Sequence, residues 1–453
     1  MNRRILRLAL PNIITNITVP LLGMVDTAIM GHLSPEGLGA IAIGAAIFNL
    51  IYWNFGFLRM GTSGITAQAY GARRWDLAVR TLVQAGAIAL AIALILIALQ
   101  WPISLLVPVI FEGSDEVLGM ALAYFRVRIW AAPATLGLYA IKGWFIGMQD
   151  SKTPMWIAIA LNCVNILFSL LFVLVFHWDI AGVALGTVVA QYSGLAMGIL
   201  FLRKKLRTEC GERSAASDEL STFNFQLSTL KAALRWADMR RFFRVNGDIF
   251  LRTVCLSAVF TFITAAGSHI GDEVLAVNNL LMQFFTLFSY IMDGFAYAGE
   301  SLVGRYIGAR EPLNLRSAVR LLLLWGLALT GVFTVAYAIG GDWFLRIFTD
   351  QQAVIDAAGR YLFWVLVIPV CGFAAFLFDG IFIGATASRT MRNAMFAATA
   401  AFFALYYGLK AAFSPLDTLA WNNILWIAFM AFLTLRGVLQ AIRLQKAIYS
   451  QAE

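Results

Sequence analysis

The chain has 453 residues, of which 60% are hydrophobic and only 13% are charged, and its mean hydropathy is +0.78. Soluble globular domains carry about 25% charged residues, so this composition excludes an ordinary soluble protein and predicts a polytopic membrane protein. The formal net charge of +9 would suit a nucleic-acid partner in a soluble protein. In a membrane protein an excess of Lys and Arg marks cytoplasmic loops instead, so we expect no nucleic-acid partner.

Twelve segments of the chain are apolar and long enough to cross about 30 Å of hydrocarbon. The basic residues before the first segment resemble the start of a signal peptide, but no A-x-A-like site follows, so we interpret that segment as a retained helix. The sequence therefore predicts an all-α membrane protein with 12 transmembrane helices. The expected spans are residues 8–31, 38–68, 79–109, 118–147, 154–177, 181–202, 243–268, 274–304, 317–348, 355–385, 391–413 and 418–443.

The distribution of basic residues predicts the orientation in the membrane. Lys and Arg gather on every second connection, whereas the intervening loops GHLSPEG, FEGSDEV, HWDIAG and GSHIGDE contain none. Because cytoplasmic loops carry the positive excess, we expect both termini in the cytoplasm. The cations that fall toward the outer side are exceptions, which we interpret as long side chains reaching the membrane surface; they are Arg126, Arg128, Arg346, Arg360 and Lys410.

The two halves of the chain match each other at an offset of 237 positions. Gly71–Arg73 corresponds to Gly308–Arg310, and Phe145–Gly147 corresponds to Phe382–Gly384. Each half has an even number of spans and hence the same topology, which is typical of parallel repeats. We predict two six-helix bundles related by a pseudo-two-fold axis along the membrane normal. The expected domains are residues 1–202, 242–453 and a polar cytoplasmic linker, 203–241, that ends in a short amphipathic helix.

One carboxylate, Asp26, lies inside the apolar stretch PLLGMVDTAIMGHL of the first span. A charged side chain at the centre of a membrane helix costs about 2.5–3.5 kcal/mol, and a carboxylate avoids this cost by taking up a proton. Pro11 and Pro20 precede Asp26 in the same span and permit a bend. Asp26 is either a structural aspartate hydrogen-bonded within the bundle or a proton carrier coupled to conformation, and we favour the second interpretation.

Three uncharged polar residues lie at a depth similar to that of Asp26, counted at about 1.5 Å per helical residue. Asn165 and Ser169 are spaced i, i+4 and share one helix face, and Thr187 follows on the next span. We predict that these residues and Asp26 form a polar layer that hydrates a cavity in the outer half of the first bundle. The alternative for each uncharged residue alone is a hydrogen bond that holds two helices together.

The second half contains its own set of charged residues within predicted spans. Arg252 and Asp379 lie at similar depths and are expected to pair. By the repeat offset, Asp379 corresponds to Lys142 of the first half. For Arg59, Lys142 and Arg252 we favour a structural ion pair over a functional role, and both interpretations stay open. The predicted cluster in the second half consists of Asp248, Arg252, Asp293, Glu300 and Asp379.

Enzyme chemistry finds no support in the sequence. The three histidines, His32, His177 and His269, fall at outer loop ends without metal-ligand spacing, and the four cysteines are scattered. The sequence contains no phosphate-binding glycine-rich loop, so we expect that ATP hydrolysis is not the energy source. We expect no catalytic residue, no metal site and no cofactor.

Several segments resemble the multidrug and toxic compound extrusion (MATE) family, and most closely its bacterial DNA-damage-inducible protein F (DinF) branch. The resemblance covers nearly the whole chain and is carried by RLALPNIITNITVPLLGMVDTAIMGHL, FLRMGTSGITAQAYGAR, NGDIFLRTVCL, FSYIMDGFAYAGESLVGRYIGAR and FDGIFIGATASRTMRNAM. It implies a secondary antiporter of the bacterial inner membrane that exports amphipathic, often cationic compounds against an inward flow of H⁺ or Na⁺. We expect it to function as a monomer.

The resemblance also implies roles for individual residues. Asp26 is similar to the proposed proton acceptor, and Asn165 and Thr187 match other members of that network. The position aligned with Ser169 is usually an aspartate in the relatives, which leaves Asp26 as the only acid there. Sodium-coupled relatives use acids of helices 7 and 10; Asp379 matches the latter, but a cation beside it argues for H⁺ as the coupling ion.

Three alternatives stay open from the sequence. A lipid-linked precursor flippase of the same superfamily would need a wide cationic groove, and a Na⁺-coupled exporter would need free acids in the second half. An intramembrane enzyme would need a paired nucleophile and base or a metal cluster.

Overall fold

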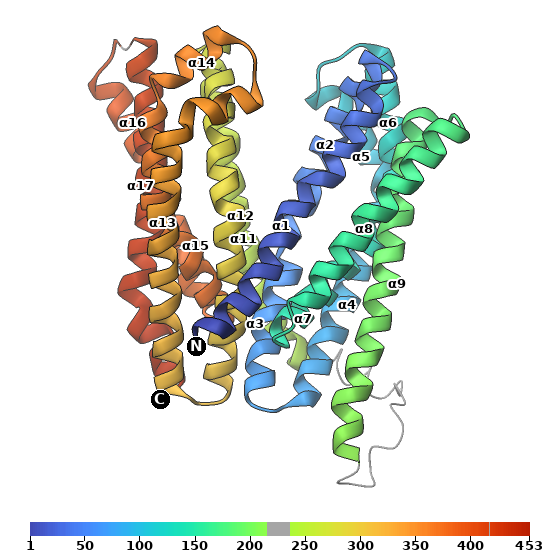
Figure 1. Ribbon diagram of the computed structural model, residues 1–453, viewed down its shortest axis with the longest axis vertical. Helices are drawn as coiled ribbons and strands as arrows, with labels where there is room; N and C mark the ends of the chain where they lie inside the picture. The colour runs from blue at the N-terminus through green and yellow to red at the C-terminus, as the bar shows by residue number, and fades with distance from the viewer. Residues whose placement is uncertain (215–235, 416) are drawn as a thin grey trace. The chain divides into compact units, whose positions relative to one another are not determined.

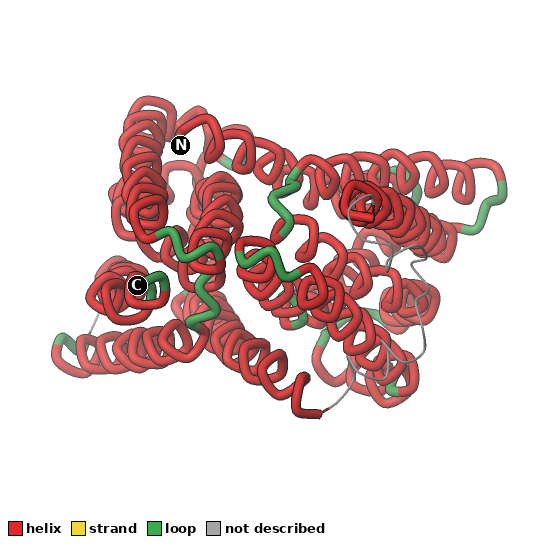
Figure 2. Tube along the Cα trace, turned by 90° about the horizontal axis from the view of Figure 1, so that it is seen from below, coloured by secondary structure: helices red, strands yellow, loops and turns green. Residues whose placement is uncertain are grey.

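The computed structural model describes residues 1–214, 236–415 and 417–453, and every regular element in these ranges is helical (Figures 1 and 2). The predicted all-α membrane fold is confirmed. The helices are α1 (Asn2–Gly31), α2 (Pro35–Asn54), α3 (Phe57–Gly71), α4 (Trp75–Ala98), α5 (Gln100–Ile110), α6 (Asp115–Arg128), η1 (Ile129–Ala131), α7 (Ala132–Gly147), α8 (Lys152–Leu170), η2 (Leu171–Val175), α9 (Asp179–Ser214), α11 (Trp236–Ile270), α12 (Asp272–Gly308), α13 (Pro312–Phe348), α14 (Gln352–Gly359), α15 (Leu362–Gly384), α16 (Ser388–Ala412), α17 (Thr418–Ala447) and η3 (Tyr449–Gln451).

Among the described residues, 11 helical stretches are long and apolar enough to cross a membrane, against the 12 predicted. The difference lies in the predicted span 118–147, which the structure divides into α6, η1 and α7. Pro133 stands in the first turn of α7 and cannot donate the hydrogen bond that would continue a helix from α6. Neither piece alone has the length that a spanning helix needs.

Three other predicted spans each contain a short break between two helices, at Phe55–Gly56, at Leu99 and at Arg360–Tyr361. In contrast, α1 runs unbroken from Asn2 to Gly31 and passes through Pro11 and Pro20. The two prolines therefore do not end the helix, and the bend predicted there stays a prediction.

The helices on either side of the predicted linker are longer than expected. α9 continues to Ser214, well beyond the expected end at residue 202, and α11 begins at Trp236. Lys and Arg have high helix propensity, so a run such as Arg203–Lys205 extends the helix out of the apolar region. The predicted amphipathic helix of the linker falls mostly on residues 215–235, outside the described residues.

The chain divides into two compact units. The N-terminal unit comprises Ile14–Tyr70 and Arg74–Arg244, and the C-terminal unit comprises Met1–Ile13, Gly71–Arg73 and Val245–Glu453. The first turns of α1 belong to the C-terminal unit, where the Arg4 guanidinium donates to the Tyr306 hydroxyl at 3.3 Å. The predicted domain boundaries stay a prediction.

Each unit contains a close helix contact that follows the repeat seen in the sequence. In the N-terminal unit α7 packs on α3, and in the C-terminal unit α15 packs on α12. Two glycines on each of α7 and α15 lie so close to the neighbouring backbone that a Cβ would collide with it, a common use of small residues between membrane helices. The contacting pairs are Gly143–Arg59 and Gly147–Ser63 in one unit and Gly380–Ala296 and Gly384–Glu300 in the other, each displaced by 237 positions.

Large apolar side chains cover much of the surface of both units. Val109, Ile339 and Ile442 are 78%, 85% and 69% exposed. Extensive exposure of this kind is unfavourable in water and is expected where hydrocarbon is the solvent. The surface thus agrees with a protein embedded in a lipid bilayer.

Candidate functional site

The four residues of the predicted polar layer lie together inside the N-terminal unit. The Thr187 hydroxyl donates to Asp26 Oδ2 at 3.2 Å, and Asn165 Nδ2 donates to Thr187 Oγ1 at 3.1 Å and to Ser169 Oγ at 3.4 Å. None of the four residues is more than 1% exposed. One hydrogen-bonded chain thus connects α1, α8 and α9.

Two local features bring these three helices close enough for the chain to form. A Cβ at Gly186 would collide with the backbone of Ser169, so the glycine beside Thr187 allows α9 to approach α8. The side-chain amide of Asn162 donates to the carbonyl of Thr18 at 3.1 Å and connects α8 to α1. Ser169 is followed by the π-helical turn η2, a feature that often marks functional sites.

The Thr187 hydroxyl has two acceptors within reach but only one proton. Asp26 Oδ2 lies at 3.2 Å and the carbonyl oxygen of Val183 at 3.3 Å. The hydroxyl can donate to an ionised Asp26; alternatively it can donate to Val183 and accept a hydrogen bond from a protonated Asp26. Rotation of a single hydroxyl therefore accommodates both charge states of Asp26 without movement of a helix.

Asp26 is incompletely paired. Its second oxygen, Oδ1, is buried and has no hydrogen-bond partner among the described residues, and the same holds for Asn165 Oδ1. A buried polar atom without a partner costs about 1–3 kcal/mol, and more when the group is charged. A proton or a cation that enters the site can therefore bind to this unpaired carboxyl oxygen.

The sequence reasoning missed two residues of α6 that belong to this site. The Arg128 guanidinium lies 4.9 Å from the ring centre of Phe48 and 5.3 Å from that of Tyr124, and it donates to the Tyr124 hydroxyl. Both Arg128 and Tyr124 interact electrostatically with Asp26. The interpretation of Arg128 as a side chain that reaches the membrane surface is therefore wrong. Its i, i+4 spacing from Tyr124 was the available signal.

In the C-terminal unit the expected pairing of Arg252 with Asp379 is present. Asp379 also accepts a hydrogen bond from Arg436 at 2.6 Å and from Gln440 at 3.1 Å, and it is only 7% exposed. Arg436 is itself only 3% exposed, inside α17. Two buried guanidinium groups thus hold one carboxylate.

The other acids of the predicted C-terminal cluster have different surroundings. Asp248 accepts from Ser388 at 2.9 Å and pairs with Arg392 at 2.6 Å, so it belongs to a separate network. Asp293 acts electrostatically on Arg436. Glu300 is buried on α12, where its backbone contacts α15. The expectation of a single cluster is corrected to an Asp379 network and an Asp248 network.

Lys142 departs from the ion-pair interpretation. It is half-buried on α7 and its electrostatic neighbour is another cation, Arg59. Within the described residues no acid lies within ion-pair distance of Lys142.

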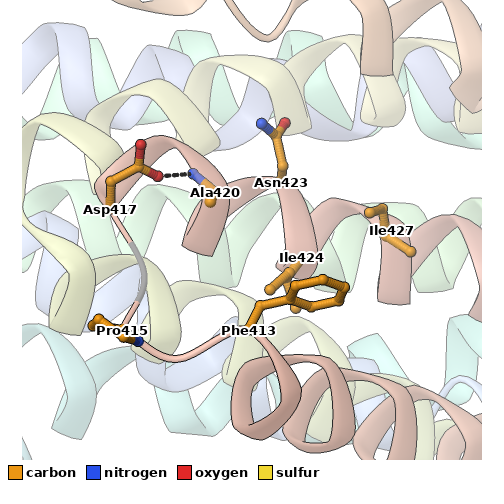
Figure 3. A pocket seen from close by; sticks show the side chains of 7 residues that line it. All are labelled: Phe413, Pro415, Asp417, Ala420, Asn423, Ile424 and Ile427. Carbon is orange, nitrogen blue, oxygen red and sulfur yellow. Dashed lines mark hydrogen bonds between the residues drawn. The ribbon is translucent and has the colours of Figure 1, made fainter.

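A shallow pocket at the turn between α16 and α17 does not qualify as the site. Asp417 caps α17 by accepting from the Ala420 amide at 2.7 Å, as Figure 3 shows, and Asn423 accepts from Trp364 at 2.8 Å. Both polar side chains are thus engaged in holding the fold. The pocket is lined by Phe413, Pro415, Asp417, Ala420, Asn423, Ile424 and Ile427.

The model of the MatE family matches residues 11–171 and 249–407 of the chain. This protein belongs to the MATE family. Over 436 residues it is 39% identical to DNA damage-inducible protein F of Escherichia coli K12, covering 95% of this chain and 89% of that protein. It is also 25% identical to the chloroplastic protein DETOXIFICATION 44 of Arabidopsis thaliana, over 84% and 71% of the two chains. A probable multidrug resistance protein NorM of Geobacillus kaustophilus is 24% identical over 81% and 79%.

Solved structures support the same fold. A multidrug resistance MATE transporter in an outward-facing conformation aligns with a TM-score of 0.83 at 17% identity, covering 99% of this chain and 96% of that chain. A MATE protein in a bent conformation aligns with a TM-score of 0.82 at 18% identity, covering 100% and 97%. The MATE chain described here is thus a multi-pass membrane transporter with the two-lobed fold of its family.

Proposed function

We propose that this MATE protein is a proton-coupled antiporter that exports amphipathic, often cationic small molecules from the bacterial cytoplasm, as a monomer with both termini in the cytoplasm. The observation that carries the proposal is the Asp26 carboxyl: it is 1% exposed, holds one hydrogen bond from Thr187 and keeps one buried oxygen unpaired. Such a group can carry one proton across the apolar region.

Coupling requires that the proton and the substrate favour different states of the transporter. Ionised Asp26 attracts a cationic substrate, whereas protonated Asp26 carries no charge to attract it. The Thr187 hydroxyl, within 3.2 Å of Asp26 and 3.3 Å of Val183, stabilises each form in turn. Protonation from one side and release of the proton toward the other complete the exchange.

The test is ethidium transport by the full-length protein in liposomes with an imposed pH gradient. We expect Asp26→Asn to abolish proton-driven transport, because the amide cannot ionise. Asp76→Asn is the matched control: Asp76 is a half-exposed aspartate near the start of α4 and should tolerate the change. Unchanged proton-driven transport in Asp26→Asn would remove Asp26 from the mechanism.

The hydrogen bonds and ion pairs of Asp379 make sodium an unfavourable coupling ion. Sodium needs carboxylate oxygens that are free to bind it, yet Asp379 is already held by Arg252, Arg436 and Gln440. A sodium gradient applied without a pH gradient should therefore drive no ethidium transport. Sodium-driven transport that disappears in Asp379→Asn would favour the sodium-coupled alternative.

A further inference from the structure

We propose that a groove on the C-terminal unit binds one anionic phospholipid, with an acyl chain against apolar side chains of α13 and α15 and the phosphate on Arg320. The groove has a volume of about 450 Å³ and is bounded by α13, α15 and η3, which all belong to this unit. This inference depends neither on Asp26 nor on the identity of the coupling ion. It assigns to the groove a lipid that stays in the membrane and is not transported.

The apolar part of the groove is formed by side chains that recur along two packed helices. On α13, Leu324 and Leu327 follow Arg320 at i+4 and i+7 and therefore share its helix face. Phe373 and Phe378 line the groove from α15. Leu324 and Leu327 are 50% and 57% exposed, whereas Phe378 is buried, so the groove is open to the outside and closed at its base. In a bilayer, a hydrocarbon chain fills such a surface.

Arg320 lies at the level where the hydrocarbon of the bilayer begins. The helix α13 has 37 residues, whereas about 20 residues cross the hydrocarbon, so about two turns at each end extend beyond it. Arg320 follows the first residue of α13, Pro312, by just over two turns, and residues 321–339 after it contain no charged residue. We therefore expect the guanidinium at the depth of the lipid headgroups and the leucines of the groove at the depth of the acyl chains.

The charge of Arg320 is available to a headgroup. Its side chain is exposed, and no ion pair within residues 1–214, 236–415 and 417–453 includes it. The acid nearby is already engaged: Glu453 pairs at 2.7 Å with Arg316, one turn before Arg320. The Arg316 guanidinium also lies 5.4 Å from the ring centre of Tyr449, which lines the groove. A free guanidinium at this position can bind a phosphate with two parallel hydrogen bonds.

The charges at this end of the groove determine which phospholipid is favoured. A zwitterionic headgroup carries a cation of its own, which the guanidinium groups of Arg316 and Arg320 repel. An anionic headgroup carries no such cation, and basic pockets between transmembrane helices bind headgroups of this kind. One arginine near the membrane surface should favour an anionic lipid by about fivefold in affinity. Tyrosine is enriched at the same depth of the membrane, as Tyr449 is here.

The experiment measures lipid binding to the purified, delipidated full-length protein by native mass spectrometry. The probes are palmitoyl-oleoyl phosphatidylglycerol, which is anionic, and palmitoyl-oleoyl phosphatidylethanolamine, which has the same chains and no net charge. We expect the wild type to bind one phosphatidylglycerol about fivefold more tightly than phosphatidylethanolamine. Arg320→Gln should remove this preference, and Arg320→Lys should keep it. Arg443→Gln is the matched control, because Arg443 is an exposed arginine of α17 in the same unit and does not line the groove.

Leu327→Trp tests the apolar part of the groove, because the larger side chain fills it. This variant should bind both lipids more weakly by a similar factor. If Arg320→Gln does not fold, raising ammonium acetate from about 0.1 M to about 1 M replaces it: screening should abolish the wild-type preference, and a preference that persists would refute the role of the charge.

Equal preferences for phosphatidylglycerol in Arg320→Gln and Arg443→Gln would overturn the inference. Two other results would also overturn it. Displacement of phosphatidylglycerol by ethidium would assign the groove to a transported substrate. A protein dimer that disappears in Leu327→Trp would assign the groove to a second copy of the chain.

Discussion

Removal of the Asp379 charge tests whether the buried network of the C-terminal unit is structural. Asp379→Asn preserves the size of the side chain but takes the negative charge from between Arg252 and Arg436, which are 5% and 3% exposed. Two buried cations then face each other with only an amide between them. Loss of one partner of a buried ion pair typically costs about 3–5 kcal/mol, and we expect a loss of unfolding free energy in that range.

The size of the effect should depend on which partner is removed. Arg436→Met leaves the pair of Arg252 with Asp379 in place and removes one charged hydrogen bond, which is worth about 1.5–3 kcal/mol. Gln440→Met removes the hydrogen bond of 3.1 Å and should cost less than either change. The double variant Asp379→Asn/Arg436→Met should be more stable than Asp379→Asn alone, because it relieves the repulsion between the two arginines.

Unfolding by sodium dodecyl sulfate in mixed micelles, followed through the 13 tryptophans, measures these differences. Asp350→Asn is the control, because Asp350 is exposed in a connection and should change stability by no more than about 0.5 kcal/mol. Asp379→Asn with the stability of the Asp350 control would refute the structural reasoning. So would a well-folded Asp379→Asn protein that has lost proton-driven ethidium transport.

Three further variants test other parts of the structure. Gly147→Ala should destabilise the protein by about 1–3 kcal/mol, because the added Cβ would collide with the Ser63 carbonyl. Gly86→Ala is the control in the same unfolding assay: nothing lies near its Cβ, so this change should be neutral or slightly stabilising. Thr187→Val should reduce proton-driven ethidium transport about tenfold or more, since it removes a hydrogen bond to a charged group. Thr187→Ser keeps the hydroxyl and should keep the activity. Equal transport rates in the two variants would exclude a role of the hydroxyl in transport. Ser169→Asp adds a second acid and should raise the pH midpoint of ethidium binding, and an unchanged midpoint would show that the two positions do not interact.

The polar layer was predictable because helical geometry relates sequence to depth. The i, i+4 spacing of Asn165 and Ser169 places them on one face, and counting residues from the outer loops places Thr187 and Asp26 at the same level. The repeat was predictable for a related reason. Glycines such as Gly143 and Gly380 stay in register at a fixed offset because each lies where two helices touch.

The same reasoning found Arg252 as the partner of Asp379 but missed the contacts of Arg128 and Arg436. Counting positive charges per loop places Arg128 at the outer membrane surface and Arg436 on a cytoplasmic connection, since it treats every arginine near a helix end alike. Their burial depends on partners in distant parts of the sequence, Phe48 for Arg128 and Asp379 for Arg436. The break between α6 and α7 was missed because hydropathy continues through Pro133 even where the helix does not.

The two units share one helical arrangement but carry charges of opposite sign at an equivalent position. At equivalent positions of the repeat, α7 carries Lys142 and α15 carries Asp379. The acid of the C-terminal unit is held by two guanidinium groups and an amide, so removing its charge is costly and a proton gains little by binding. The acid of the N-terminal unit has one hydroxyl donor and an unpaired oxygen, so its charge can change at small cost. A transporter that must bind and release a proton in every cycle is expected to use the incompletely paired carboxyl, which is why we place the coupling at Asp26.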